Sequence, residues 1–97
     1  MKYKKSILTD NMGECYICKH KNVEIHHVYY GKNRKKATED GCVIPLCYIH
    51  HRGMNGVHGK NGGFLNTELK QEMEKRWLEY YHKDIEDFIK KYGRNYL

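Results

Sequence analysis

The chain has 97 residues, 39% of them hydrophobic, which suits one compact domain and is too short for two separate cores. Its 18 Lys and Arg against 12 Asp and Glu give a formal net charge of +6, which favours a polyanionic partner such as nucleic acid. Residues 42–49 form the longest apolar stretch, far below the roughly 20 residues that span a bilayer, so we expect no membrane association. Residues 1–10 carry lysines without an apolar segment behind them and do not resemble a secretory signal, so we expect a cytoplasmic protein.

Residues 1–12 are polar and lack periodicity, which predicts a flexible N-terminal arm. We expect residues 13–97 to form a single domain, in which 13–63 build a core module and 64–97 build two C-terminal helices. The pair Cys15 and Cys18 predicts a tight turn of the zinc-knuckle kind at the start of this domain. The predicted fold class is therefore α+β.

Two strands are expected next. Residues 23–30 are rich in β-branched and aromatic side chains that alternate as in a strand. Residues 31–41 are polar and read as a loop, after which residues 42–45 resume an apolar run. Together these segments predict an open β-hairpin.

Helical spacing begins at Leu46. Cys47 and His50 would share one face of this helix, and His51 and Asn55 another. Five glycines between positions 53 and 63 would end the helix and form a glycine-rich loop.

Two further helices are expected at the C-terminal end. Asn66 is the expected N-cap of an amphipathic helix with apolar residues at four-residue steps. Asp84 can cap a second helix that ends before Gly93. Trp77, together with Tyr80 and Tyr81, would more often fill the core, although a structural or regulatory protein could use these rings to dock on a partner.

Four side chains have the spacing of a metal site. Cys15 and Cys18, followed by Cys47 and His50, make a Cys3His set typical of structural zinc. Such a site contributes an apparent ~10–16 kcal/mol, as much as the whole net stability of an ordinary domain. The alternative is that these are ordinary buried thiols, and Cys42 is expected to be one.

A second group combines residues 24–28 of the expected strand with His51, Asn55 and His58. Phosphodiester hydrolysis needs a base that deprotonates water and a cation that neutralises developing charge, and imidazoles serve both purposes. His26 and His27 face opposite sides of a regular strand, so we predict a bend or bulge there. Taken singly, each histidine would more often be a packing residue.

This order of motifs, with residues 46–51 reading Leu-Cys-Tyr-Ile-His-His, resembles the HNH nucleases of the ββα-metal, or His-Me finger, superfamily over residues 13–60. The resemblance implies a zinc-stapled ββα-metal finger followed by the two helices. It implies His27 as general base, His26 and His51 as ligands of a catalytic Mg²⁺, Mn²⁺, Ni²⁺ or Zn²⁺ ion, and His50 in place of the family's last zinc-binding cysteine. Either His58, which we favour, or Asn55 would complete the catalytic metal site.

One position departs from the family. The Asn that names the motif would stand five residues before Cys47, where this chain has Cys42. In the family that Asn braces the loop that carries the base, so its absence implies either a backbone substitute through Asp40 or Gly41, or reduced activity. The ensemble looks like small phage-encoded HNH proteins, which implies the cytoplasm of a bacterial or phage-infected cell.

The expected function is metal-dependent DNA cleavage with 5′-phosphate products and little sequence preference, and RNA or branched DNA are alternative substrates. The candidate phosphate contacts are basic residues of the expected hairpin loop and of the glycine-rich segment: Lys32, Arg34, Lys35, Lys36, Arg52 and Lys60. A single site predicts nicking, unless a homodimer or a recombination or replication partner supplies a second. The alternative function is a zinc-stapled nucleic-acid-binding adaptor without catalytic activity.

Overall fold

Two antiparallel strands make the one sheet found in residues 6–97, the part of the chain that the computed structural model describes. β1 (Val23–His27) pairs with β2 (Val43–Cys47) in a continuous register that runs from Val23↔Cys47 to His27↔Val43. All of β2 is buried, whereas β1 buries only its last two residues, both histidines. The predicted hairpin pairing is confirmed.

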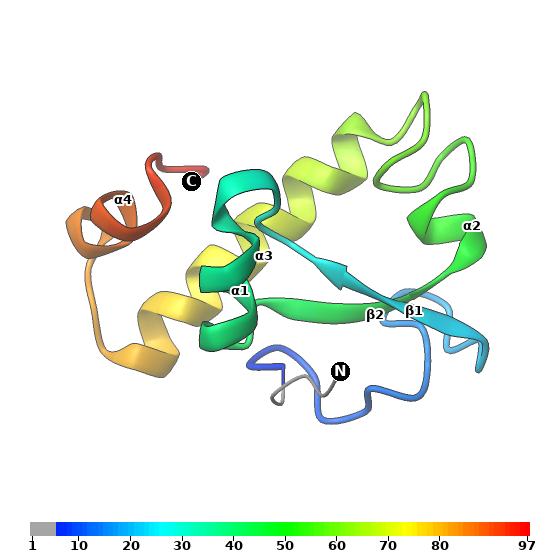
Figure 1. Cartoon of the computed structure of the whole chain (residues 1–97), viewed down its shortest axis with the longest axis horizontal. Helices are drawn as coiled ribbons and strands as arrows, with labels where there is room; N and C mark the ends of the chain where they lie inside the picture. Colours follow the sequence, from blue (N-terminus) through cyan, green and yellow to red (C-terminus); the bar gives the residue numbers. More distant parts are fainter. Residues whose placement is uncertain (1–5) are drawn as a thin grey trace.

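Helical elements surround this strand pair: the 3-10 helix η1 (Gly31–Asn33), α1 (Arg34–Asp40), α2 (Tyr48–His51), α3 (Gly63–Tyr81) and α4 (Ile85–Tyr92). α2 and α4 lie at opposite ends of the long axis, and α3 spans much of the distance between them (Figure 1). Over residues 6–97, no helix combines the length and the apolar character needed to cross a membrane. The architecture is a small α+β domain.

The connection between the strands is helical, so the prediction of a loop over residues 31–41 is wrong. Residues 34–40 include good helix formers such as Arg, Lys, Ala and Glu. Gly41 ends α1 in the left-handed conformation, with φ of 78°, and its N–H bonds to carbonyls of the last turn. The polar, basic composition of residues 31–41 therefore belongs to the exposed face of a helix and does not indicate a loop.

Two helix starts also differ from prediction. Leu46 and Cys47 remain in β2, so α2 begins at Tyr48 and ends at His51, before Asn55. α3 begins at Gly63 rather than after an Asn66 cap.

α4 matches its prediction closely. Asp84 and Asp87 form a reciprocal capping box at its start, and Gly93 ends it with φ of 91°. These signals lie within a few residues of one another along the chain, so the sequence alone reveals them.

The segment before the knuckle is attached to the fold. Ile7 is buried, its N–H donates to the Gly41 carbonyl at 2.9 Å, and its carbonyl accepts from Arg76 Nε at 2.8 Å. The expected flexible arm thus differs from the structure at these positions, while residues 1–5 lie outside the described part.

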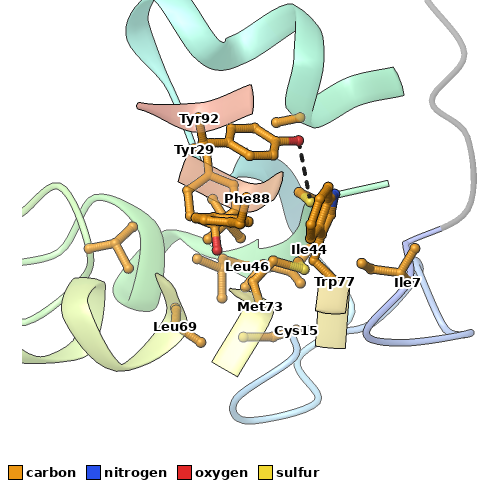
Figure 2. Packing of buried hydrophobic residues seen from close by; sticks show 14 of the residues in the cluster. Ile7, Cys15, Tyr29, Ile44, Leu46, Leu69, Met73, Trp77, Phe88 and Tyr92 are labelled. Atoms are coloured by element: carbon orange, nitrogen blue, oxygen red, sulfur yellow. Dashed lines mark hydrogen bonds between the residues drawn. The ribbon is translucent and has the colours of Figure 1, made fainter. Parts of the chain in front are cut away.

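Aromatic rings fill the core between β2, α3 and α4 (Figure 2). The ring centroids of Tyr29 and Tyr92 lie 4.8 Å apart, and those of Trp77 and Phe88 lie 5.3 Å apart. The burial of rings of this size contributes a large share of the free energy that stabilises a small domain. Trp77 is therefore a core residue, as expected.

Cys42 lies in the same core, and the Tyr92 hydroxyl lies 3.7 Å from its Sγ (Figure 2). Burial raises the pKa of this thiol to about 12. The expectation of a core thiol is confirmed, and the raised pKa favours the neutral thiol over the reactive thiolate.

A buried carboxylate joins three helices. Asp40, the last residue of α1, accepts hydrogen bonds from Trp77 Nε1 at 2.9 Å, Tyr92 Oη at 2.8 Å and Lys91 Nζ at 2.7 Å. Its backbone carbonyl accepts from the Tyr81 hydroxyl at 2.6 Å. A charge this buried is tolerated only when its oxygens are paired, so these donors hold the end of α1 against α3 and α4.

The variant Asp40→Ala should lower the free energy of unfolding by about 3 kcal/mol, because the donors of Trp77 and Tyr92 would be left buried and unpaired. Chemical denaturation measures the loss. Glu39→Ala, at the exposed neighbouring position, is the control and should change stability by less than about 0.5 kcal/mol. Equal effects of the two substitutions would contradict the role assigned to Asp40.

Candidate metal centres

The predicted Cys3His set forms one compact cluster. Its ligand atoms all lie within 4.8 Å of one another. Cys18 Sγ lies 3.6 Å from Cys47 Sγ, and His50 Nδ1 lies 3.7 Å from Cys15 Sγ. Ligand atoms of a tetrahedral site with Zn–S bonds of about 2.3 Å lie about 3.8 Å apart, so the cluster could hold a structural metal ion.

Local backbone structure sets each half of this cluster. The knuckle closes through hydrogen bonds from Cys15 N–H to the His20 carbonyl at 2.8 Å and from Lys19 N–H to the Cys15 carbonyl at 2.9 Å. Tyr16 N–H donates to the Pro45 carbonyl of β2 at 2.8 Å, which fixes the knuckle beside the sheet. Cys47 ends β2, and the first turn of α2 brings His50 back to it.

Cys15 is the thiol of this cluster whose surroundings favour binding of a cation. At Cys18, the backbone N–H of His20 lowers the pKa, but desolvation and the neighbouring Cys47 and Cys15 thiols outweigh it and raise the pKa. Burial raises the pKa of Cys15, but backbone N–H groups of Cys18, Cys47 and Ile17 outweigh it and lower the pKa to about 6. The thiolate, the form that binds metal, is therefore favoured at neutral pH.

A second cluster brings together three histidines from separate segments. His26 of β1, His51 of α2 and His58 of the following loop have ligand atoms within 4.8 Å of one another. Their ring centroids are 5.2, 5.1 and 4.9 Å apart, close to an equilateral triangle. Within residues 6–97, the metal-binding groups gathered here are all imidazoles, which suits a divalent transition metal.

The glycine-rich loop places His58. A Cβ at Gly59 would lie 1.8 Å from the Gly53 carbonyl oxygen, and one at Gly62 would lie 1.6 Å from that of Gly56. Only glycine permits such close backbone approach. The loop is therefore tightly coiled, and His58 N–H donates to the His51 carbonyl at 3.0 Å.

His26 carries the strongest sign of a missing partner. Its side chain is 1% exposed, and Nε2 is buried without a hydrogen-bond partner among the described residues. Burial, followed by the charges of His51 and His58, lowers its pKa to about 3. The ring is thus neutral and has a lone pair available, as a metal ligand requires.

Glu24 orients the ring of His51. His51 Nδ1 lies 2.7 Å from Glu24 Oε1, and Arg52 Nε donates to the same oxygen at 2.9 Å. These two contacts lower the pKa of Glu24, so its carboxylate accepts the proton of His51 Nδ1. The lone pair of His51 then sits on Nε2, available to a metal. The sequence places Glu24 in the second group of candidate residues without a task of its own, although its position two residues before His26 on the same strand face is a signal for one.

A hollow of about 240 Å³ opens beside the trio, and its lining residues are Ile25, His26, His27, Tyr30, Arg34, His51, Arg52 and His58. The predicted bulge is wrong, because the register is continuous through His26 and His27. Both histidines nevertheless line the hollow. In the described structure β2 is the one strand paired with β1, so no second strand covers its other edge.

The remaining predicted residues are less closely associated. Asn55 and His58 are both exposed, but His58 lines the hollow and Asn55 does not. Lys32, Lys35 and Lys36 are exposed on η1 and α1, and Lys36 Nζ donates to the Lys91 carbonyl at 2.8 Å. Lys60 is exposed in the glycine-rich loop, so only Arg34 and Arg52 of the six basic candidates line the hollow.

His27 is held in a different way from His26. Its Nε2 lies 2.9 Å from Thr38 Oγ1 of α1. Burial, and then the nearby charge of Arg34, lowers its pKa, so the ring is neutral at neutral pH. A neutral, partly enclosed imidazole beside a cation site is suited to accept a proton.

Comparison with known proteins found no matching family, no matching curated protein and no matching solved structure. The chemistry of these clusters therefore rests on their own geometry.

Removing one thiol should remove one metal ion per chain. Cys18→Ser deletes one of the four donors of the Cys3His cluster at an exposed position, where little packing is lost. Elemental analysis after dialysis against a competing chelator measures the metal content. Cys42→Ala is the matched control and should keep the full content. Cys18→Ser protein that also kept it would exclude Cys18 as a ligand.

Acid should destabilise the metal-free histidine trio through His26. An unfolded histidine takes up its proton near pH 6.5, whereas His26 in the fold does so near pH 3, so stability falls as the pH drops below 6.5. Between pH 7 and pH 5, His26→Phe should lose about 2 kcal/mol less than the wild type. Denaturant titrations at both pH values measure this difference, and equal losses in the two proteins would contradict it.

Proposed function

We propose that the chain is a metal-dependent endonuclease of the HNH type that hydrolyses DNA phosphodiester bonds, with His27 as its general base. One observation carries the proposal: the trio of His26, His51 and His58 lines the same hollow as His27, with Arg34 and Arg52 beside them. Base, cation site and anion-binding groups are the parts that phosphodiester hydrolysis requires.

Two metal centres of different character support this assignment. The Cys3His cluster is a closed set of four donors, which suits structural zinc. The trio has three donors and adjoins an open hollow, which leaves positions for water and substrate. With His26 and His27 on β1, His51 on α2, and β2 paired to β1, the arrangement fits a zinc-stapled ββα-metal finger.

Each side chain then has a defined task. His27 takes a proton from a water molecule, and its lowered pKa keeps it neutral and able to do so. Arg34 and Arg52 bind the non-bridging oxygens of the scissile phosphate. A Mg²⁺, Mn²⁺ or Ni²⁺ ion held by the trio would supply positive charge for the leaving 3′ oxygen, and the product carries a 5′ phosphate.

The formal net charge of +6 favours contacts to phosphates rather than to bases. α2 has four residues, too few to present a set of base-reading side chains in a groove. We therefore propose low sequence preference, affinity that falls with salt, and nicking by a single site.

Supercoiled plasmid should be nicked by the wild type with a divalent metal and left intact with EDTA. His27→Ala and His51→Ala should each slow nicking by at least about 100-fold, because one removes the base and the other a metal donor. His82→Asn, at an exposed position after α3, is the matched histidine control and should cut at the wild-type rate.

Binding to a labelled DNA duplex, measured by fluorescence anisotropy, separates the nuclease from the adaptor alternative. Nuclease function requires cutting that is lost in both variants while binding by His27→Ala persists. Tight binding by a wild type that cuts with none of these metals would instead identify a zinc-stapled adaptor.

A further inference from the structure

We infer that Thr38 is a positioning residue that fixes the tautomer of His27, so that the basic nitrogen of this ring is Nδ1. This inference rests on the proposed function for its catalytic meaning, whereas the tautomer itself is a property of the folded chain. Neither motif spacing nor composition marks Thr38, which lies in the segment predicted to be a loop.

Two contacts of one hydroxyl determine the direction of the hydrogen bond. Thr38 Oγ1 lies 3.1 Å from the Arg34 carbonyl oxygen and 2.9 Å from His27 Nε2. A carbonyl can only accept, so the single hydroxyl proton points to Arg34. The hydroxyl oxygen must then accept from His27, which places the ring proton on Nε2 and the lone pair on Nδ1.

This arrangement suits a base that must gain and lose a proton. When Nδ1 takes the proton of water, Nε2–H stays bonded to the Thr38 oxygen, and the ring does not reorient during the reaction. The accepting Thr38 oxygen also stabilises the positive charge that forms on the His27 ring. The positive charge of nearby Arg34 disfavours that protonated form.

α1 is held in place by its neighbours, so the Thr38 hydroxyl that it carries can orient the His27 ring. Ala37 is buried, and Asp40 joins the end of the helix to α3 and α4. The Cys42 N–H donates to the Ala37 carbonyl at 2.8 Å, and the Cys42 carbonyl accepts from Val28 N–H at 3.0 Å. The backbone at Cys42 thus links α1 to the residue that follows His27.

In a chain that acts as an HNH nuclease, backbone hydrogen bonds at Cys42 and the Thr38 side chain, four residues earlier, would supply the brace that the motif Asn gives the family.

The tautomer can be measured without any nuclease activity. Long-range ¹H–¹⁵N correlation spectra of the zinc-loaded, ¹⁵N-labelled chain at pH 7.5 should show His27 protonated on Nε2 in the wild type and in Thr38→Ser. Thr38→Val keeps the shape and removes the acceptor, so it should shift His27 toward the other tautomer or a mixture. Thr67→Val, at an exposed position on α3, is the matched control and should leave the His27 signals unchanged.

Plasmid nicking supplies the second readout. Thr38→Val should lower kcat by about 10- to 100-fold with DNA affinity unchanged, and Thr38→Ser should recover most of the rate. A wild-type His27 protonated on Nδ1, or a Thr38→Val protein that keeps the Nε2–H tautomer, would overturn the inference. Correct tautomers in a chain that cuts no DNA with any metal would overturn the proposed nuclease and leave the role of Thr38 in place.

Discussion

The register between β1 and β2 is the constraint on which the rest of the structure depends. Side chains alternate along a strand, so a slip of one residue would exchange the faces of His26 and His27 and separate the histidine trio. Two strands of five residues are marginal by themselves, and contacts at both ends must hold the register. At one end, the knuckle bonds to Pro45 and shares its cluster with Cys47. At the other, Asp40 and the backbone at Cys42 hold α1 in place.

The residues that hold the register are different from the residues that line the hollow. Cys15 and Cys47 of the Cys3His cluster belong to the same buried cluster as the aromatic rings, whereas the histidine trio lines the hollow. A small domain has little apolar surface to bury, so a metal ion held by the Cys3His cluster would add to its stability. The hollow can then expose polar side chains without weakening the core.

Local signals predicted much of this fold. The two short-spaced ligand pairs, the strand pairing and the Asp84 cap are recognisable because their residues interact within a few positions or in a regular alternation. The helix α1 was missed because its basic face resembles a loop. The N-terminal residue Ile7 was missed because its burial depends on Arg76 and Gly41, far away in the chain.

By itself, the sequence determined the residue types of both clusters and the ligand pairs that spacing defines. It left open the choice between Asn55 and His58: helical periodicity favours Asn55, and imidazole chemistry favours His58. In the fold, His58 lines the hollow and Asn55 does not. Only the tertiary structure brings His58 to the hollow, Glu24 to His51 and Thr38 to His27. The reason is physical: a ligand pair within one turn is set by local backbone geometry, whereas these partners meet only when β1, α1, α2 and the glycine-rich loop pack together.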